Sequence, residues 1–103
     1  MAERQDFSSG DWHVRAGSEE AFVARWIEFL EWTRDNAPGF ISARLVRDEN
    51  EARHYVSFGE WESAAAAGAW MTLPDFAAKF GACTALCDDA RGSRYTLAAA
   101  VQG

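Results

Sequence analysis

The chain has 103 residues, enough for one domain and too few for two domains that each bury a hydrophobic core. Ten basic and sixteen acidic side chains leave a net charge of −6, and no basic cluster interrupts this balance, which argues against binding to nucleic acid or to an anionic membrane. The sequence contains no apolar run long enough to span a membrane, and its first residues are too charged to begin a secretory signal. We therefore expect a cytoplasmic protein with no membrane partner.

The N-terminal part of the chain predicts a lead-in, a strand and a long helix. Residues 1–7 are polar and without pattern, so we expect them to be frayed and a single domain to occupy residues 8–102. A strand at about residues 8–15 would place Trp12 on the same face as Val14. The next helix is expected to begin after an N-cap at Ser18 and to end near residue 35, with a broad apolar face.

Two strands with a short acidic connection then predict a hairpin, at residues 40–47 and 53–61. Alternate side chains of a strand point to opposite faces, so Tyr55, Ser57 and Trp61 share one face of the second strand. A tryptophan at the end of a strand, beside a glycine that leaves space, suits the wall of a small-molecule pocket as well as it suits a core.

The C-terminal part predicts two helices and a last strand. A short Ala-rich helix is expected up to about residue 71, a second helix from about residue 75 to residue 87, and a strand at about residues 93–102. The order βαββ(αα)β, without an internal repeat, is typical of an α+β ferredoxin-like fold. We therefore expect a four-stranded antiparallel sheet with the helices on one face.

The other face of this sheet would be open, and its expected residues are too apolar for a solvated surface. The chain is also rich in aromatic residues, with five Trp and seven Phe. A homodimer packed sheet to sheet into a shared barrel would hide this surface. The apolar residues expected on the open face are Ile41, Ala43, Leu45, Val56 and Phe58.

The cysteines and histidines predict neither a disulfide nor a metal site. Cys83 and Cys87 are spaced one helical turn apart, which is too wide for a disulfide, so both are expected to be reduced. His13 and His54 are the only histidines, and no usual ligand spacing connects them with each other or with the cysteines.

Four segments, spread along most of the chain, carry a family resemblance. They are residues 17–26 (GSEEAFVARW), 38–45 (PGFISARL), 56–63 (VSFGEWES) and 70–76 (WMTLPDF). These segments resemble the antibiotic biosynthesis monooxygenase family of the dimeric α+β barrel superfamily. The resemblance implies a homodimer with a pocket between sheet and helices, and in several members this pocket serves the cofactor-independent oxygenation of anthrones or quinols. It therefore implies an apolar aromatic molecule and dioxygen as partners, and no cofactor.

The resemblance leaves the reaction open, because a fold does not determine a function. One hypothesis is a cofactor-independent monooxygenase acting on a small hydroxylated aromatic or quinol. The alternative is a non-catalytic dimeric protein of the same fold, with a role in small-molecule binding or stress response. A further branch of the superfamily degrades haem with a histidine on the late helix, and this chain has Phe80 near that position, so haem degradation is disfavoured.

Three residues are candidates for catalysis, namely Arg44, Tyr55 and His54, although none is an unambiguous general base. Arg44 could stabilise a phenolate as a fixed cation, and the simpler interpretation is a surface ion pair. His54 could act as a base, but strand alternation places it on the face opposite Trp61, where a structural role is simpler. Trp61 matches a strand-end tryptophan that lies in the pocket of characterised family members. The expected substrate-binding residues are Trp61, Tyr55, Ser57, Trp26, Phe76 and Phe80.

Overall fold

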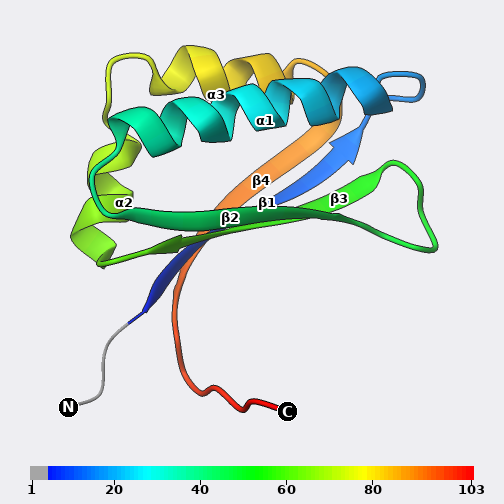
Figure 1. The fold of residues 1–103 in the computed structure, drawn as a ribbon. Coiled ribbons are helices and arrows are strands. Elements are labelled where there is room, and N and C mark those ends of the chain that lie inside the picture. The colour runs from blue at the N-terminus through cyan, green and yellow to red at the C-terminus, as the bar shows by residue number, and fades with distance from the viewer. Residues whose placement is uncertain (1–4) are drawn as a thin grey trace.

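The structure is a computed structural model that describes residues 5–103. Its elements follow the predicted order, with a long first helix and two shorter ones (Figure 1). The strands are β1 (Asp6–Val14), β2 (Phe40–Arg47), β3 (His54–Trp61) and β4 (Cys87–Thr96), and the helices are α1 (Glu19–Asn36), α2 (Ala64–Trp70) and α3 (Phe76–Thr84).

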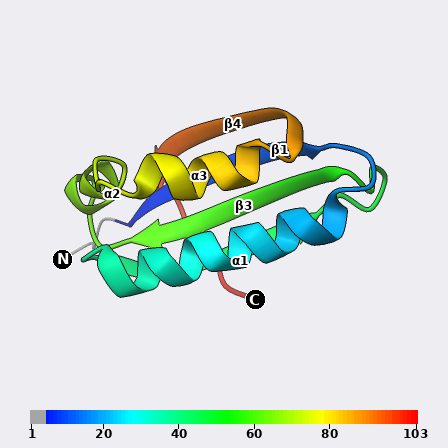
Figure 2. The same cartoon turned by 90° about the horizontal axis from the view of Figure 1, so that it is seen from above.

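The four strands form one antiparallel sheet in the order β2-β3-β1-β4. Helices α1 and α3 lie side by side over one face of this sheet, and α2 lies at one end of it (Figures 1 and 2). The other face carries no helix. This arrangement confirms the predicted α+β ferredoxin-like class and the predicted β2–β3 hairpin. None of the helices within residues 5–103 is both long and apolar enough to cross a membrane.

Both ends of the domain differ from the prediction. β1 begins at Asp6, which is buried and stands opposite Trp61, so residues 6 and 7 belong to the sheet. Gln5 precedes the strand, and residues 1–4 of the expected lead-in lie outside the described residues. At the other end, α3 stops at Thr84 and β4 already begins at Cys87, about six residues before the predicted strand. β4 is an edge strand with exposed side chains, so it can contain polar residues. In the sequence, these polar residues suggested a loop.

Helix α1 buries an apolar stripe formed by Phe22, Trp26 and Phe29, with Thr33 continuing it. This stripe confirms the predicted amphipathic helix. Ser18 occupies the N-cap position, but its side chain makes no capping hydrogen bond, contrary to expectation. Its carbonyl oxygen accepts the amide of Phe22 at 2.8 Å.

From Ser42 onward, the side chains of strand β2 point to the opposite faces of the sheet from those predicted. The pairing with β3 shifts between Phe40 and Ser42, where one extra residue is inserted in β2. A bulge of this kind reverses the facing of every later side chain. Ala43 and Leu45 therefore pack on the helix side, and Arg44 stands opposite Phe58 on the open side.

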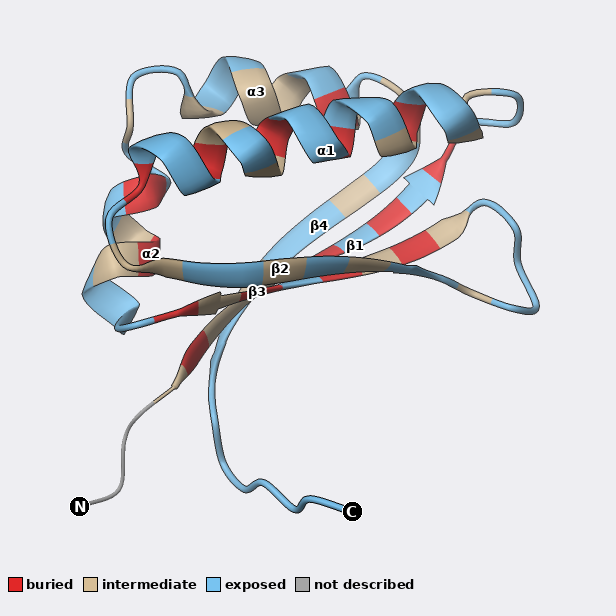
Figure 3. Ribbon diagram, viewed as in Figure 1, coloured by how far each residue is buried: buried red, intermediate tan, exposed pale blue. Residues whose placement is uncertain are grey.

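The open face of the sheet nevertheless carries apolar side chains. Phe58 is 50% exposed and Val46 is 50% exposed, and Val56 is the strand partner of Val46. Strands β2 and β4 are exposed or intermediate along their length (Figure 3). The prediction that Val56 and Phe58 face away from the helices is thus confirmed. The expectation for Ala43 and Leu45 was wrong, because the bulge in β2 was not visible in the sequence.

Candidate functional site

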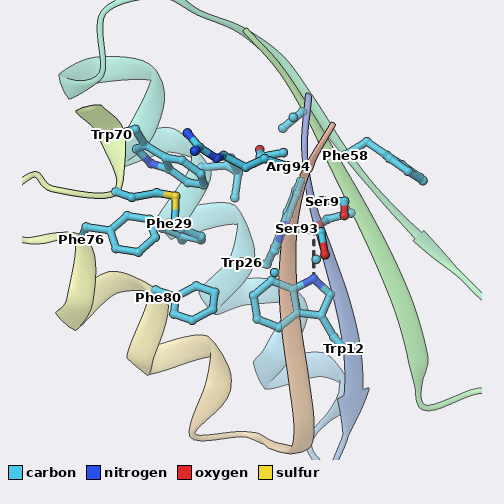
Figure 4. A pocket seen from close by; sticks show the side chains of 18 residues that line it. Ser9, Trp12, Trp26, Phe29, Phe58, Trp70, Phe76, Phe80, Ser93 and Arg94 are labelled. Carbon is cyan, nitrogen blue, oxygen red and sulfur yellow. Dashed lines mark hydrogen bonds between the residues drawn. The ribbon is translucent and has the colours of Figure 1, made fainter. Parts of the chain in front are cut away.

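A cavity of about 440 Å³ lies between the sheet and the helices. Aromatic rings from α1, α2 and α3 form one side of it, and strand residues form the other (Figure 4). The strand side includes Trp12, Arg94 and a group of small residues, namely Ser8, Gly10, Ala43, Ser57, Gly59 and Gly92. The helix side consists mainly of Trp26, Phe29, Leu30, Trp70, Met71, Phe76 and Phe80.

The cavity exists because small residues stand next to one another across three strands. Gly10 of β1 lies between Gly92 of β4 and Ser57 of β3, and the neighbouring row places Ser8 opposite Gly59. Small side chains leave space above the sheet that the helices do not fill. The rings on the helix side support one another, since the Phe76 and Phe80 rings stack at 5.5 Å between centroids.

A five-residue pattern occurs on both central strands, although the sequence suggested no internal repeat. Residues 8–12 (SSGDW) and residues 57–61 (SFGEW) share serine, glycine, an acid and tryptophan at the same spacing. Antiparallel pairing brings the two copies together with serine opposite glycine. The Trp12 indole Nε1 donates to Ser57 Oγ at 3.0 Å, and the Trp61 indole Nε1 donates to Ser8 Oγ at 3.1 Å.

The glycines of this pattern provide room for the two indoles. A Cβ atom at Gly10 would overlap the Trp12 ring, and a Cβ atom at Gly59 would lie 2.7 Å from Ser8 Oγ and 3.3 Å from Trp61 Nε1. Each tryptophan therefore lies back along its own strand, over the glycine two residues before it. Because both indole donors are satisfied, the two rings are fixed in orientation.

The two tryptophans of the pattern occupy different places. Trp12 lines the cavity, with its ring 5.6 Å from that of Phe80. Trp61 has no exposed surface and packs against Trp70 at 4.9 Å, outside the cavity lining. Trp61, which was expected in the pocket, is therefore not among the residues that line this cavity, and Trp12, which sequence reasoning assigned only to a strand, lines it. The repeated pattern was the signal that could have identified Trp12.

Of the remaining expected binding residues, four line the cavity and one does not. Ser57, Trp26, Phe76 and Phe80 all line the cavity. Tyr55 shares their side of the sheet but is buried against Phe22, with ring centroids 5.3 Å apart, and does not contribute to the lining.

Two of the catalytic candidates lie away from the cavity. Arg44 stands opposite Phe58 on the open face of the sheet and does not line the cavity, whereas Tyr55 faces the helix side. His54 also lies on the open face, as strand alternation predicted, and its ring stacks on that of His13 at 4.6 Å. Neither side chain is part of the cavity lining.

The charged member of the cavity lining is Arg94, on β4, which sequence reasoning did not select. It stands opposite Ser8 in the sheet, and its Nη1 donates a long hydrogen bond of 3.4 Å to the Ala64 carbonyl oxygen. Among the lining residues there is no His, Asp, Glu, Lys or Cys. The polar groups that can meet a bound molecule are thus one guanidinium and several serine hydroxyls.

The serine hydroxyls are prepared to donate. Ser57 Oγ and Ser8 Oγ each accept an indole N–H, which leaves the hydroxyl hydrogen free to turn towards the cavity. An oxygen that already accepts a hydrogen bond is a stronger donor through its own O–H. The site can therefore stabilise negative charge on an oxygen atom of a flat apolar molecule.

The cysteines take no part in this site. Both are free thiols, as expected. Burial raises the pKa of Cys83 to about 12, so this side chain is a neutral thiol near neutral pH rather than a nucleophile.

The fold and the cavity define a ferredoxin-like α+β protein with an apolar cavity between sheet and helices. The sequence profile of the antibiotic biosynthesis monooxygenase family matches residues 10–80. The chain therefore belongs to this family and is a monooxygenase-like protein. A search of curated proteins found no matching sequence.

Several solved structures share the fold. A single-residue variant of SnoaB, a cofactor-independent oxygenase from Streptomyces nogalater, superposes with a TM-score of 0.84 at 20% identity, covering 99% of this chain and 100% of that one. A second structure of SnoaB superposes with a TM-score of 0.76 at 19% identity, covering 98% of this chain and 97% of that one. A protein from Shewanella oneidensis superposes with a TM-score of 0.78 at 18% identity, covering 93% of each chain. At these identities the likeness concerns the fold alone.

Proposed function

We propose that this protein is a cofactor-independent monooxygenase that oxidises a small hydroxylated aromatic or quinol in the cavity under α1 and α3. The observation that carries the proposal is an aromatic cavity whose one charged lining residue, Arg94, stands beside serine hydroxyls. A volume of about 440 Å³ suits a molecule of two or three fused rings. Family membership and the activity named for SnoaB support the same class of reaction.

The chemistry requires little of the protein beyond binding and ionisation. A deprotonated anthrone or hydroquinone is electron-rich enough to reduce dioxygen itself. For an anthrone, the ring CH₂ group becomes C=O with one oxygen atom of O₂, and the other oxygen atom leaves as water. Arg94 and the hydroxyls of Ser8 and Ser57 would stabilise the substrate oxyanion, and the aromatic rings would exclude bulk water.

The test is dioxygen uptake with a panel of anthrones and hydroquinones, using wild type, Arg94→Gln and Arg44→Gln. Arg44 is a matched control, because it is also a strand arginine but lies on the open face. We expect Arg94→Gln to lower kcat/KM at least about tenfold, as for loss of one oxyanion donor, and Arg44→Gln to leave it unchanged. Absence of uptake above buffer for every compound would refute the enzymatic proposal.

The second candidate is a non-catalytic small-molecule-binding protein, possible because the cavity lining contains no general base. The same panel distinguishes the two, with tryptophan fluorescence reporting binding. Saturable quenching that Trp12→Phe alters and Trp32→Phe does not, without dioxygen uptake, would favour binding alone. Trp12 is the informative position because it lines the cavity.

We further propose that the protein is a homodimer whose subunits pack through their open sheet faces. Half of the Phe58 surface and half of the Val46 surface are exposed there, and Tyr95 of β4 is 57% exposed. After β4 the chain continues away from the sheet on this open side, and it carries the exposed Leu97 and Val101 (Figure 1). A second sheet would bury these apolar groups together.

A further inference from the structure

The open face of the sheet carries a cluster of two histidines and carboxylates that the cavity does not use. His13, in the penultimate position of β1, stands directly opposite His54, the first residue of β3. Their rings are nearly parallel, 4.6 Å apart with an angle of 10° between planes. The two histidines are 41 positions apart in the sequence, and the expectation of no metal site rested only on spacing along the chain.

Asp11 brings a carboxylate to the same point. Its Oδ1 lies 2.7 Å from His54 Nε2 and 3.5 Å from His13 Nε2. One ligand atom from each of the three residues lies within 4.8 Å of the others. Atoms bound at about 2.0–2.2 Å to one ion are separated by about 2.9–3.5 Å in octahedral or tetrahedral geometry, so only small side-chain movements are needed to reach coordination.

Asp48 holds the histidine at the centre of the cluster in a suitable orientation. Its Oδ2 lies 2.9 Å from His54 Nδ1. Histidines that bind metals commonly donate their other ring N–H to a carboxylate, which fixes the tautomer and directs the free nitrogen to the ion. The Asp48 side chain is 30% exposed, against 54% for Asp11, so the orienting contact is also the more protected one.

We propose that Asp11, His13 and His54 form a binding site for a divalent transition-metal ion, with Asp48 as the residue that positions His54. Two imidazoles and one carboxylate are a ligand set for Zn²⁺, Co²⁺, Ni²⁺ or Fe²⁺, and they leave coordination positions open. Mg²⁺ and Ca²⁺ prefer oxygen ligands throughout and are excluded by this set. The site lies on the opposite face of the sheet from the cavity and does not depend on the proposed oxygenation.

On β4, Asp89 stands opposite His13 and Arg91 stands opposite Asp11, so both signs of charge flank the cluster.

The test is calorimetric titration of untagged, chelator-treated protein with ZnCl₂, NiCl₂ and CoCl₂, supported by the absorption spectrum of the Co²⁺ complex. We expect one ion per chain. His13→Gln and Asp11→Asn should each weaken binding at least about tenfold, and Asp48→Asn should weaken it about 10- to 100-fold. Glu49→Gln, which removes a neighbouring carboxylate of the same loop, should have no effect. Circular dichroism checks that each variant is folded.

A second group of side chains near His54 provides the result that would overturn the proposal. The structure offers a second grouping around the other nitrogen of His54, formed with Asp48 and Glu51. Loss of binding in Glu51→Gln together with full binding in His13→Gln would place the ion there and refute the site proposed. Absence of any saturable binding by wild type would refute it as well. Broadening or shift of both histidine ring resonances on addition of Co²⁺ gives a readout without a variant.

Discussion

The indole N–H of Trp12 donates to the hydroxyl oxygen of Ser57, 45 residues away, at 3.0 Å. The same relationship is repeated between Trp61 and Ser8, so each central strand provides the ring for one contact and the hydroxyl for the other. These two bonds fix the aromatic side of the core and the floor of the cavity at once. Their removal should therefore affect stability and binding together.

Ser57→Ala should lower the free energy of unfolding by about 1–3 kcal/mol, because it leaves the buried Trp12 indole N–H without a partner. Urea denaturation followed by tryptophan fluorescence measures the change. Ser9→Ala is the control, since Ser9 points to the open side of β1 and takes part in neither tryptophan contact. Equal stability of the two variants would contradict the role given to the Ser57 hydroxyl.

Gly10→Ala should destabilise the fold by about 1–3 kcal/mol, since the new methyl group overlaps the Trp12 indole. Gly81→Ala is a matched change within helix α3, where a Cβ atom meets nothing within 4 Å. There we expect a gain of about 0.5–1 kcal/mol from the better helix propensity of alanine. Thermal unfolding of both variants provides the comparison, and the two shifts should have opposite signs.

His54 should titrate above the ordinary histidine range in metal-free protein. Hydrogen bonds to Asp48 and Asp11 raise its pKa, and the bond to His54 lowers the pKa of Asp48. A pKa raised on folding means that protonated His54 stabilises the protein fully below about pH 6.5, and that this contribution is lost as the pH rises through the folded pKa.

The measurement for His54 is a ¹H NMR titration of the ring resonances in the presence of a chelator. Asp48→Asn should lower the His54 pKa towards its ordinary value, because the first of its two stabilising carboxylates is removed. Glu49→Gln should leave it unchanged. An unaltered titration curve in Asp48→Asn would show that the contact at 2.9 Å does not persist in solution.

Phe58→Asp should convert a dimer to a monomer, if the open face is the dimer interface as proposed. A charge at this position cannot be buried against a second sheet without a partner. Ile27→Asp is the control, because Ile27 is 45% exposed, close to the 50% of Phe58, but lies on a helix. Light scattering coupled to size exclusion gives the mass of each species. A monomeric wild type, or a dimeric Phe58→Asp variant, would exclude this interface.

Much of the fold follows from local patterns in the sequence. Helix α1, the β2–β3 hairpin and the alternation of Tyr55, Ser57 and Trp61 were predictable, because periodicity and turn residues act over a few positions. The ends of strands β1 and β4 could not be predicted from such local patterns. Both strands contain polar residues that adopt a strand conformation only because a neighbouring strand pairs with them. A short stretch of sequence does not show which distant strand will pair with it.

The positions of the functional residues depended on the tertiary structure. A one-residue bulge in β2 moved Arg44 to the open face, and the β1–β3 register moved Trp12 rather than Trp61 into the cavity lining. The same register joined His13 to His54 and Asp11. The sequence by itself determined the class of fold and the aromatic character of the site. Strand register, which long-range backbone pairing sets, decided which side chains meet there.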